Sequence, residues 1–298
     1  MPNLSLHGIV PALITPFRQD ERIDFDAWQA IIEAHLSAGV HGLFVAGPQG
    51  EFFSLDDEER LVVLRFARQA VAGRVPVYGN AGCATTRASV KLAEQAEAEG
   101  VDVIALSAPL YLRPSADELT EHYLEICRAV RAPVLACEIP AAVAARIGAR
   151  APNFIGVLDS TANLETAAGC VREGLLAFSG ADSAIQAALE EGCAGVVSGV
   201  ANIAPRLYVD LYYAWREGRT EEAGRLQSLV SDVEAAASLH ALPAAVKHSM
   251  TLQGLPAGYC RKPVGPLAQD SRRQLSDALE PLRAAGYAGR VTRATVAG

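Results

Sequence analysis

Lysine is scarce in this chain of 298 residues, which carries it only at Lys91, Lys247 and Lys262. Arginine supplies almost all of the positive charge, and acidic side chains outnumber basic ones to give a formal net charge of −8. No basic stripe runs through the sequence. Because nucleic acids and anionic membrane surfaces attract clustered positive charge, the sequence argues against both as partners.

Paired cysteines are missing as well. The six cysteines are spread along the chain without a C-x-x-C pair or a histidine-rich spacing, which argues against a zinc ribbon and a redox dithiol. We expect reduced, mostly buried thiols, and neither a bound metal nor another cofactor. The six histidines mostly fall before predicted strands or within predicted helices, so we do not expect them to be catalytic.

Long apolar runs are also absent. None approaches the ~18 residues that a membrane span needs, and residues 1–7 lack both the basic start and the apolar core of a signal peptide. Half of the residues are nevertheless hydrophobic, which is enough to bury a large core in a chain of this length. We therefore expect a soluble, cytoplasmic protein.

Short apolar, β-branched runs alternate with longer segments of helical period, and the alternation repeats eight times. Length alone leaves one or two domains open. Eight such units predict an α/β fold, a closed parallel (β/α)8 barrel over residues 1–218, followed by a C-terminal helical domain over 219–298. A doubly wound sheet would instead need a glycine-rich loop after the first strand, where this chain has Thr15, Pro16 and Phe17.

The expected elements have the following bounds. Strands are predicted over 9–15, 42–46, 75–79, 103–107, 133–137, 154–158, 176–179 and 195–198. Helices are predicted over 24–36, 56–71, 86–99, 116–130 and 181–191. Small and polar residues follow several of the strands, and in a barrel the active site lies at these carboxyl ends.

Several motifs follow one another from about residue 8 to residue 285. They include 11–17 (PALITPF), Gly47-x-x-Gly50-Glu51, Pro109-x-Tyr111-x-x-Pro114, Gly156-Val157-x-Asp159-Ser160, 195–202 (GVVSGVAN), Val246-Lys247 and Arg261-x-Pro263. Together they resemble the dihydrodipicolinate synthase / N-acetylneuraminate lyase family. The resemblance implies a (β/α)8 barrel with C-terminal helices and usually a homotetramer built from dimers. It also implies aldol-type cleavage, condensation or dehydration of 2-keto acids through a lysine Schiff base.

The family's Schiff-base lysine matches Leu158 in this chain. An imine requires an amine, and no other side chain can replace that covalent bond. We expect Lys91 within a helix, Lys247 in the C-terminal helices and Lys262 just after them, all away from the strand ends. The resemblance therefore points to an atypical member that lacks the family's central group.

Other family positions have changed too. The relay tyrosine after the fifth strand matches Cys137 and the asparagine beside it matches Glu138, while the two loop threonines match Pro48 and Gln49. The carboxylate-binding arginine matches Ala142, and Arg146, about one turn further on, is only a weak substitute. Tyr111 alone remains of the proton relay, and the resemblance places it at a subunit interface. We therefore expect a homo-oligomer, either a dimer or a tetramer.

Alternation along a strand predicts that the side chains of Cys137 and Glu138 point to opposite faces, one toward the barrel interior and one outward. If Cys137 occupies the position of the relay tyrosine, it faces the pocket. The Cys137 thiol could react only if a cation lowered its pKa; otherwise it is a small buried group packed against Leu158. The carboxylates Glu51, Glu138 and Asp159, together with Asp182, could in principle hold a hard metal ion. All except Glu138 match structural positions of the family, so we expect no metal site.

Two functions remain open. The first is a lyase, hydratase or cyclising enzyme that acts on a small, keto-acid-like metabolite without a Schiff base, with Tyr111, Cys137 and Glu138 as catalytic candidates. Its candidate ligand-binding residues are Pro48, Gln49, Asn80, Leu158, Gly180, Val197 and Ser198. The second is an inactive family member that binds a small molecule or regulates a partner. Full-length strand-end segments favour the enzyme.

Overall fold

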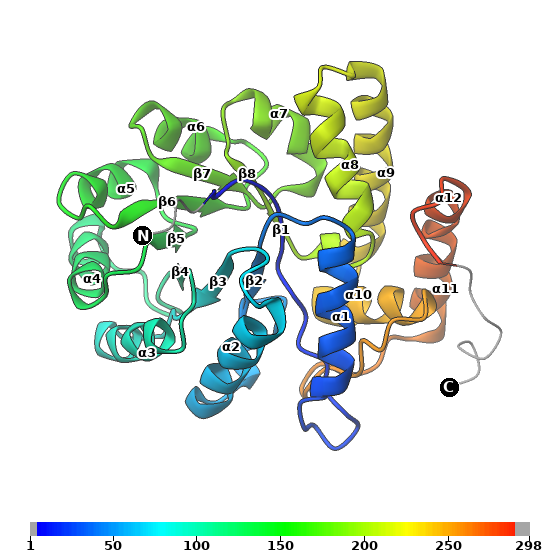
Figure 1. Ribbon diagram of the computed structural model, residues 1–298, viewed down its shortest axis with the longest axis horizontal. Helices are drawn as coiled ribbons and strands as arrows, with labels where there is room; N and C mark the ends of the chain where they lie inside the picture. Colours follow the sequence, from blue (N-terminus) through cyan, green and yellow to red (C-terminus); the bar gives the residue numbers. More distant parts are fainter. Residues whose placement is uncertain (1–4, 290–298) are drawn as a thin grey trace.

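Eight parallel strands form the centre of the fold in the computed structural model, which describes residues 5–289 (Figure 1). Their bounds are β1 Gly8–Pro11, β2 Leu43–Val45, β3 Val77–Asn80, β4 Val103–Ser107, β5 Val134–Cys137, β6 Phe154–Asp159, β7 Leu176–Ser179 and β8 Gly195–Ser198. The strands pair in the order β1-β8-β7-β6-β5-β4-β3-β2. The predicted (β/α)8 barrel is confirmed.

The barrel closes between β1 and β2 through one short contact. Ala12 forms a parallel bridge with Phe44, and the Leu13 amide donates to the Phe44 carbonyl at 2.8 Å. The Ala12 amide still donates to Ser198, so the backbone changes partner from β8 to β2 at this point. This change of partner explains why β1 ends at Pro11 rather than at residue 15 as predicted.

Helices follow the strands and cover the outside of the barrel (Figure 1). Their bounds are α1 Phe25–Ser37, α2 Asp57–Val71, α3 Thr86–Ala98, α4 Ala116–Ala129, α5 Ala141–Gly148, α6 Glu165–Arg172, α7 Ile185–Glu190 and α8 Pro205–Arg216. Asp56 and Glu59 form a capping box that starts α2, and Ser115 and Glu118 form another that starts α4. The helix predicted over 181–191 begins as the 3₁₀ turn Asp182–Ala184 before α7.

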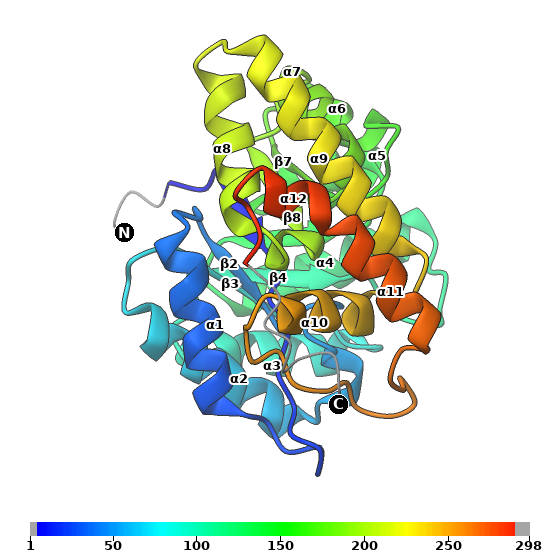
Figure 2. The same ribbon diagram turned by 90° about the vertical axis from the view of Figure 1, so that its right-hand side faces the viewer.

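Four more helices lie on one side of the barrel, where Figure 2 shows them at the front: α9 Thr220–Ser238, α10 Leu242–Leu252, α11 Gln269–Ala278 and α12 Glu280–Ala284. α9 packs along α8, and α10 packs against the 3₁₀ turn Val200–Asn202 that follows β8. The boundary between residues 218 and 219 falls in the connection from α8 to α9. We retain it as a proposed division of the chain.

Large side chains fill the barrel, so it is a packed core and not a pore. The interior cluster consists of Val10, Ala12, Phe44, Tyr78, Val103, Ala105, Leu135, Cys137, Phe178 and Val197, with Leu158 packed against it. The Tyr78 and Phe178 rings meet edge to face at 5.9 Å between centroids. A separate, larger cluster fills the layer between the strands and the helices.

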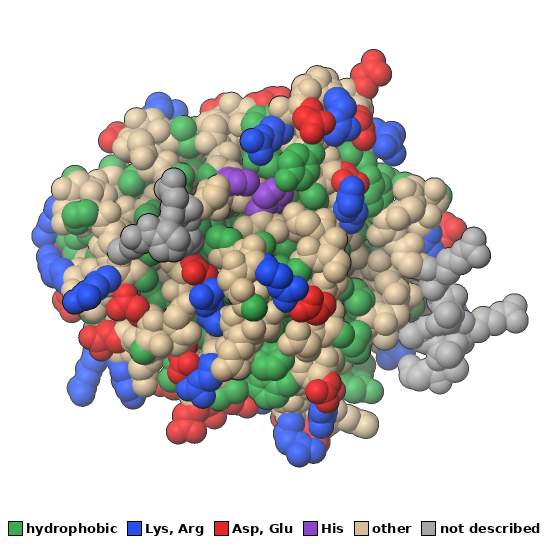
Figure 3. Space-filling view, viewed as in Figure 1, with side chains coloured by type: hydrophobic (Ala, Val, Ile, Leu, Met, Phe, Trp, Pro, Cys, Tyr) green, Lys and Arg blue, Asp and Glu red, His purple; other side chains and the backbone are tan. Residues whose placement is uncertain are grey.

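The surface is mixed in charge. Acidic and basic side chains are interspersed over the face seen in Figure 3, without a continuous basic stripe. Within residues 5–289, no helix has the length and the apolar character to cross a membrane.

Candidate functional site

Three of the predicted ligand-binding and catalytic side chains face the barrel interior at its carboxyl end. Cys137, Leu158 and Val197 all belong to, or pack against, the interior cluster. Of the adjacent residues Cys137 and Glu138, it is therefore Cys137 that faces the interior. Burial raises the pKa of its thiol to about 12, and the neighbouring Glu138 adds to the effect. The thiol is protonated at neutral pH, so these residues form an apolar wall with one weak donor.

Glu138 and Ser160 form a hydrogen-bonded pair between the ends of β5 and β6. The Ser160 hydroxyl donates to Glu138 Oε1 at 2.7 Å, and the Ser160 amide donates to the same oxygen at 3.1 Å. Desolvation of the partly covered Glu138 carboxyl raises its pKa, although the two hydrogen bonds oppose this shift. A carboxyl group with a raised pKa beside a hydroxyl can accept and return a proton.

Ser160 is absent from the residues selected by sequence reasoning, because its importance depends on a neighbour 22 positions away. Gly180 lies on its other side. A Cβ added at Gly180 would come within 2.8 Å of the Ser160 Cβ, so the glycine makes room for this serine. The predicted site residue Gly180 is thus a spacer, and Ser160 is the polar group that it accommodates.

Asn80 holds the ends of three strands together. Its side-chain amide donates to the Ala46 carbonyl at 2.9 Å, and its Oδ1 accepts from the backbone amides of Ser107 at 3.1 Å and Gly82 at 3.2 Å. The residue is completely buried. These bonds occupy both ends of the side chain, and they give Asn80 a structural task at the mouth.

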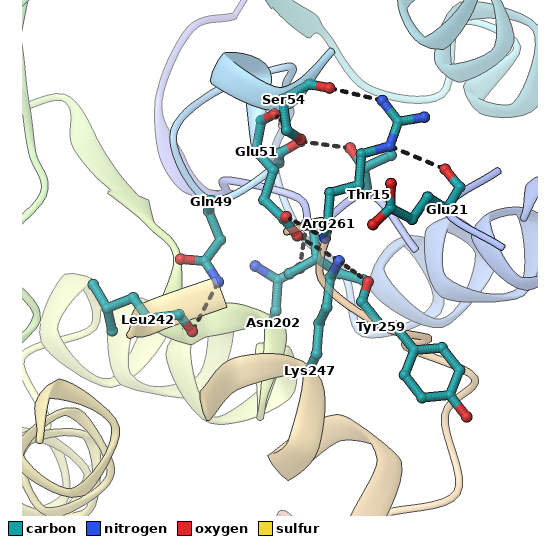
Figure 4. A network of polar contacts seen from close by, with 12 residues as sticks. Thr15, Glu21, Gln49, Glu51, Ser54, Asn202, Leu242, Lys247, Tyr259 and Arg261 are labelled. Carbon is teal, nitrogen blue, oxygen red and sulfur yellow. Dashed lines mark hydrogen bonds and ion pairs between the residues drawn. The ribbon is translucent and has the colours of Figure 1, made fainter. Parts of the chain in front are cut away.

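The two residues that match the family's threonines point in different directions. Pro48 is exposed, whereas Gln49 is 6% exposed and lies against Gly199. The Gln49 amide donates to the Leu242 carbonyl at the start of α10 (Figure 4). Gln49 therefore ties the β2 loop to the C-terminal helices. Ser198 is likewise engaged locally, because its Oγ accepts from the Ala201 amide at 2.9 Å.

Tyr111 projects from the loop between β4 and α4. Its side chain is fully exposed, and its φ of 66° lies in the left-handed region that favours glycine. Leu110 and Leu112 beside it are exposed too, at 39% and 63%. In a single chain, Tyr111 therefore contacts none of the other candidate catalytic residues.

Lys247 lies closer to the strand ends than predicted. It comes from α10, and its Nζ donates at 2.6 Å both to Glu51 Oε1 in the loop after β2 and to the Tyr259 carbonyl (Figure 4). The expectation that all three lysines lie away from the strand ends is wrong for this residue. Lys247 is only 2% exposed, and desolvation lowers its pKa although Glu51 opposes this shift. Burial closes the amine off from the mouth.

Arg146 is turned away from the mouth. Its guanidinium lies 2.6 Å from Asp117 Oδ1, which joins α5 to α4 on the outside of the barrel. Both side chains are solvent-exposed. Neither Arg146 nor Ala142 can therefore supply the bidentate hydrogen bonds by which arginine usually binds a carboxylate.

The sequence pattern of the Dihydrodipicolinate synthetase family matches residues 5–282. The chain belongs to this family. It is 34% identical over 288 residues to a 4-hydroxy-tetrahydrodipicolinate synthase of Acidiphilium cryptum, covering 93% of this chain and 98% of that protein. An uncharacterised DapA-like lyase of Halobacterium salinarum is 36% identical over 288 residues, with 94% and 95% covered.

Solved structures of the family have the same fold. YagE, a prophage protein of the dihydrodipicolinic acid synthase family from Escherichia coli K12, was crystallised in complex with pyruvate. It superposes with a TM-score of 0.90 at 27% identity, covering 93% of this chain and 99% of that one. The family resemblance seen in the sequence is confirmed.

In this member of the dihydrodipicolinate synthetase family, the four carboxylates considered for a metal lie in separate environments. Glu51 pairs with Lys247, and Glu138 with Ser160, whereas Asp159 accepts from the Thr161 amide and hydroxyl. The fourth, Asp182, is buried. In the part of the chain that the structure describes, no group of three histidine, cysteine, aspartate or glutamate side chains is placed to hold a metal ion.

Histidines of this family member lie outside the mouth. His7 and His41 precede β1 and β2, at the amino end of the barrel, where their rings pack at 5.1 Å. His35, His122 and His248 lie within helices. These positions agree with the prediction from sequence that histidines fall before strands or within helices.

Proposed function

We propose that this chain is a lyase-type enzyme of the dihydrodipicolinate synthetase family that acts on a small, keto-acid-like metabolite without a lysine Schiff base. The observation that carries the proposal is the place of Leu158, which packs against the barrel interior where the family resemblance expects the imine-forming lysine. Lys247 does not replace it, because its amine is buried in the pair with Glu51.

Glu138 is the acid–base group best supported by the geometry. Its raised pKa and its hydrogen bond to Ser160 suit a carboxyl that exchanges protons, a role usually worth about 10²- to 10⁴-fold in rate. Leu158, Val197 and Cys137 supply the apolar wall at the carboxyl end of the barrel. Tyr111 joins the site only if a neighbouring subunit presents it, as the family resemblance implies.

A homo-oligomer is part of this proposal. Large apolar side chains are exposed on both sides of Tyr111 in its loop, namely Leu112 at 63% and Leu110 at 39%. Exposed apolar side chains grouped in this way are typical of surfaces that bind another protein chain. A dimer or tetramer would cover them and bring Tyr111 to a partner's mouth.

The alternative is an inactive member that binds a small molecule or regulates a partner. The protonated Cys137 thiol favours it, as do the structural hydrogen bonds that occupy Asn80 and Gln49. Glu138→Gln separates the two functions in a screen of small carbonyl metabolites. For the enzyme, the variant loses turnover of a converted metabolite yet still binds it. For the binding protein, neither form converts any metabolite.

The absence of a Schiff base is tested by incubation with pyruvate and sodium borohydride, followed by intact-mass measurement. We expect no adduct, because reductive trapping needs an accessible amine at the mouth. Leu158→Lys provides the matched variant, since it restores an amine at the expected position. A trapped adduct on Lys247 in the unmodified protein would overturn the proposal.

A further inference from the structure

Arg60 is a buried cation without a carboxylate partner. It lies on α2 and is only 4% exposed, and among residues 5–289 no carboxylate forms an ion pair with it. Its Nη2 donates to the carbonyls of Asn80 at 2.8 Å and Gly82 at 3.1 Å, whereas its Nε has no hydrogen-bond partner. The guanidinium also lies over the Phe52 ring, and Asp57 acts on it only through its charge, without an ion pair. A buried charge without a paired counter-ion is costly, so this site favours an anion.

The third guanidinium nitrogen faces a cysteine. Arg60 Nη1 lies 3.4 Å from the Sγ of Cys83, which belongs to the loop between β3 and α3. The Ser89 hydroxyl accepts from the Cys83 amide at 2.9 Å and holds this loop residue in place. Cys83 is half-exposed and lies three positions before the start of α3, a helix of 13 residues. Cysteine thiolates are stabilised beside arginine and near helix amino ends.

The other five cysteines have different surroundings. Burial raises the pKa of Cys127 and Cys137 to about 12, and that of Cys170 and Cys193 to about 11. Burial likewise raises the pKa of Cys260 to about 12. These thiols are protonated at neutral pH, and four of the five are buried from solvent. A reaction at Cys83 alone can therefore be distinguished from a reaction of all the thiols.

We propose that Cys83 is a modification site that exchanges with small disulfides bearing carboxylates, such as glutathione disulfide, and that Arg60 attracts these disulfides to it. The Cys83 sulfur gives up its proton to solvent and attacks one sulfur of the disulfide. The old S–S bond breaks, a new one forms to Cys83, and the leaving thiolate takes a proton from solvent. The positive charge of Arg60 attracts the carboxylates of the reagent. The proposal is independent of any activity at the barrel mouth.

The test compares two alkylating reagents, iodoacetate, which is anionic, and iodoacetamide, which is neutral. Rates at Cys83 are measured by peptide mapping for the native protein and for the same protein unfolded in urea, where Arg60 no longer faces the sulfur. We expect the iodoacetate-to-iodoacetamide ratio at Cys83 to be about fivefold higher in the native protein, the effect of one unit charge at about 4 Å in water. An equal or lower native ratio would overturn the proposal.

A second experiment uses glutathione disulfide itself. Native protein is expected to gain one glutathione, mapped to Cys83, and Cys83→Ser is expected to gain none. In the alkylation experiment, Arg60→Lys keeps the positive charge and should keep the higher iodoacetate-to-iodoacetamide ratio at Cys83. Arg60→Met removes the charge and should lose the higher ratio. Addition at other cysteines, or no addition to the native protein, would contradict the assignment. Because the native-to-unfolded comparison needs no variant, it decides the matter even if Arg60→Met fails to fold.

Discussion

The Lys247 ammonium lies 2.6 Å from the Glu51 carboxylate, although 196 positions separate the two residues. Glu51 is completely buried, and its second oxygen accepts from the Arg261 amide at 3.0 Å. The pair connects α10 with the loop after β2, which forms part of the barrel mouth (Figure 4). A C-terminal helix therefore fixes the position of a strand-end loop.

Breaking this pair should destabilise the protein. We expect Lys247→Met to lower the free energy of unfolding by about 3–5 kcal/mol, because it leaves the Glu51 charge buried and uncompensated. The double variant Lys247→Met/Glu51→Gln should recover part of the loss, since it removes the charge as well. Urea unfolding measures all three proteins. Equal losses in the single and double variants would contradict the coupling.

Restoring the amine alone should not restore the conversion of 2-keto acids through a Schiff base. We expect Leu158→Lys to convert 2-keto acids at least roughly 10³-fold more slowly than the ~1 per second of an ordinary enzyme, because the acid–base and carboxylate-binding groups are still missing. Adding Pro48→Thr, Cys137→Tyr and Ala142→Arg should give faster turnover than the single change. Steady-state assays with pyruvate check both. Turnover near ~1 per second in the single variant would show that the surrounding site is intact.

Asp182 should make stability depend on pH near neutrality. Burial raises its pKa to about 7 in the folded chain, against 3.8 for an ordinary aspartate. Between these values the folded protein binds a proton that the unfolded chain has released, so this residue's contribution to stability falls as pH rises from 4 to 7, by up to about 4 kcal/mol.

Asp182→Asn provides the measurement, because asparagine does not titrate. We expect the variant to gain stability relative to the original protein as pH increases from 5 to 8, in urea unfolding at each pH. Buried His35, whose pKa is lowered to about 4, shifts stability in the opposite direction, but it is present in both proteins and cancels in the difference. A difference that stays constant over this range would disprove the assignment.

The exposed loop at Tyr111 should mediate association. We expect Leu112→Asp to lower the mass measured by light scattering towards the 31.4 kDa of one chain, because it places a charge among apolar side chains at the interface. Leu239→Asp is the matched control, since Leu239 is 68% exposed but lies in the connection between α9 and α10. A native mass of one chain, or equal effects of both variants, would argue against this interface.

Periodicity and motif order were sufficient to predict the barrel and the family. These features depend on near neighbours in the chain: β-branched runs form strands, and Leu158 follows Gly156 and Val157 within one of them. Alternation along β5 predicted that one of Cys137 and Glu138 faces inward, and the tertiary structure shows that it is Cys137. The bounds of β1 were less predictable, because its end depends on a change of hydrogen-bond partner at Leu13.

Tertiary structure alone decided which polar groups meet. Ser160 reaches Glu138 because parallel pairing brings the ends of β5 and β6 together, and Arg146 binds Asp117 because α5 packs beside α4. Lys247 approaches the mouth only because α10 folds back over the turn after β8. Each contact joins segments far apart in the chain, so no local sequence pattern encodes it. Barrel closure and helix packing determine which charged groups are paired, and these pairings determine the chemistry available at the mouth.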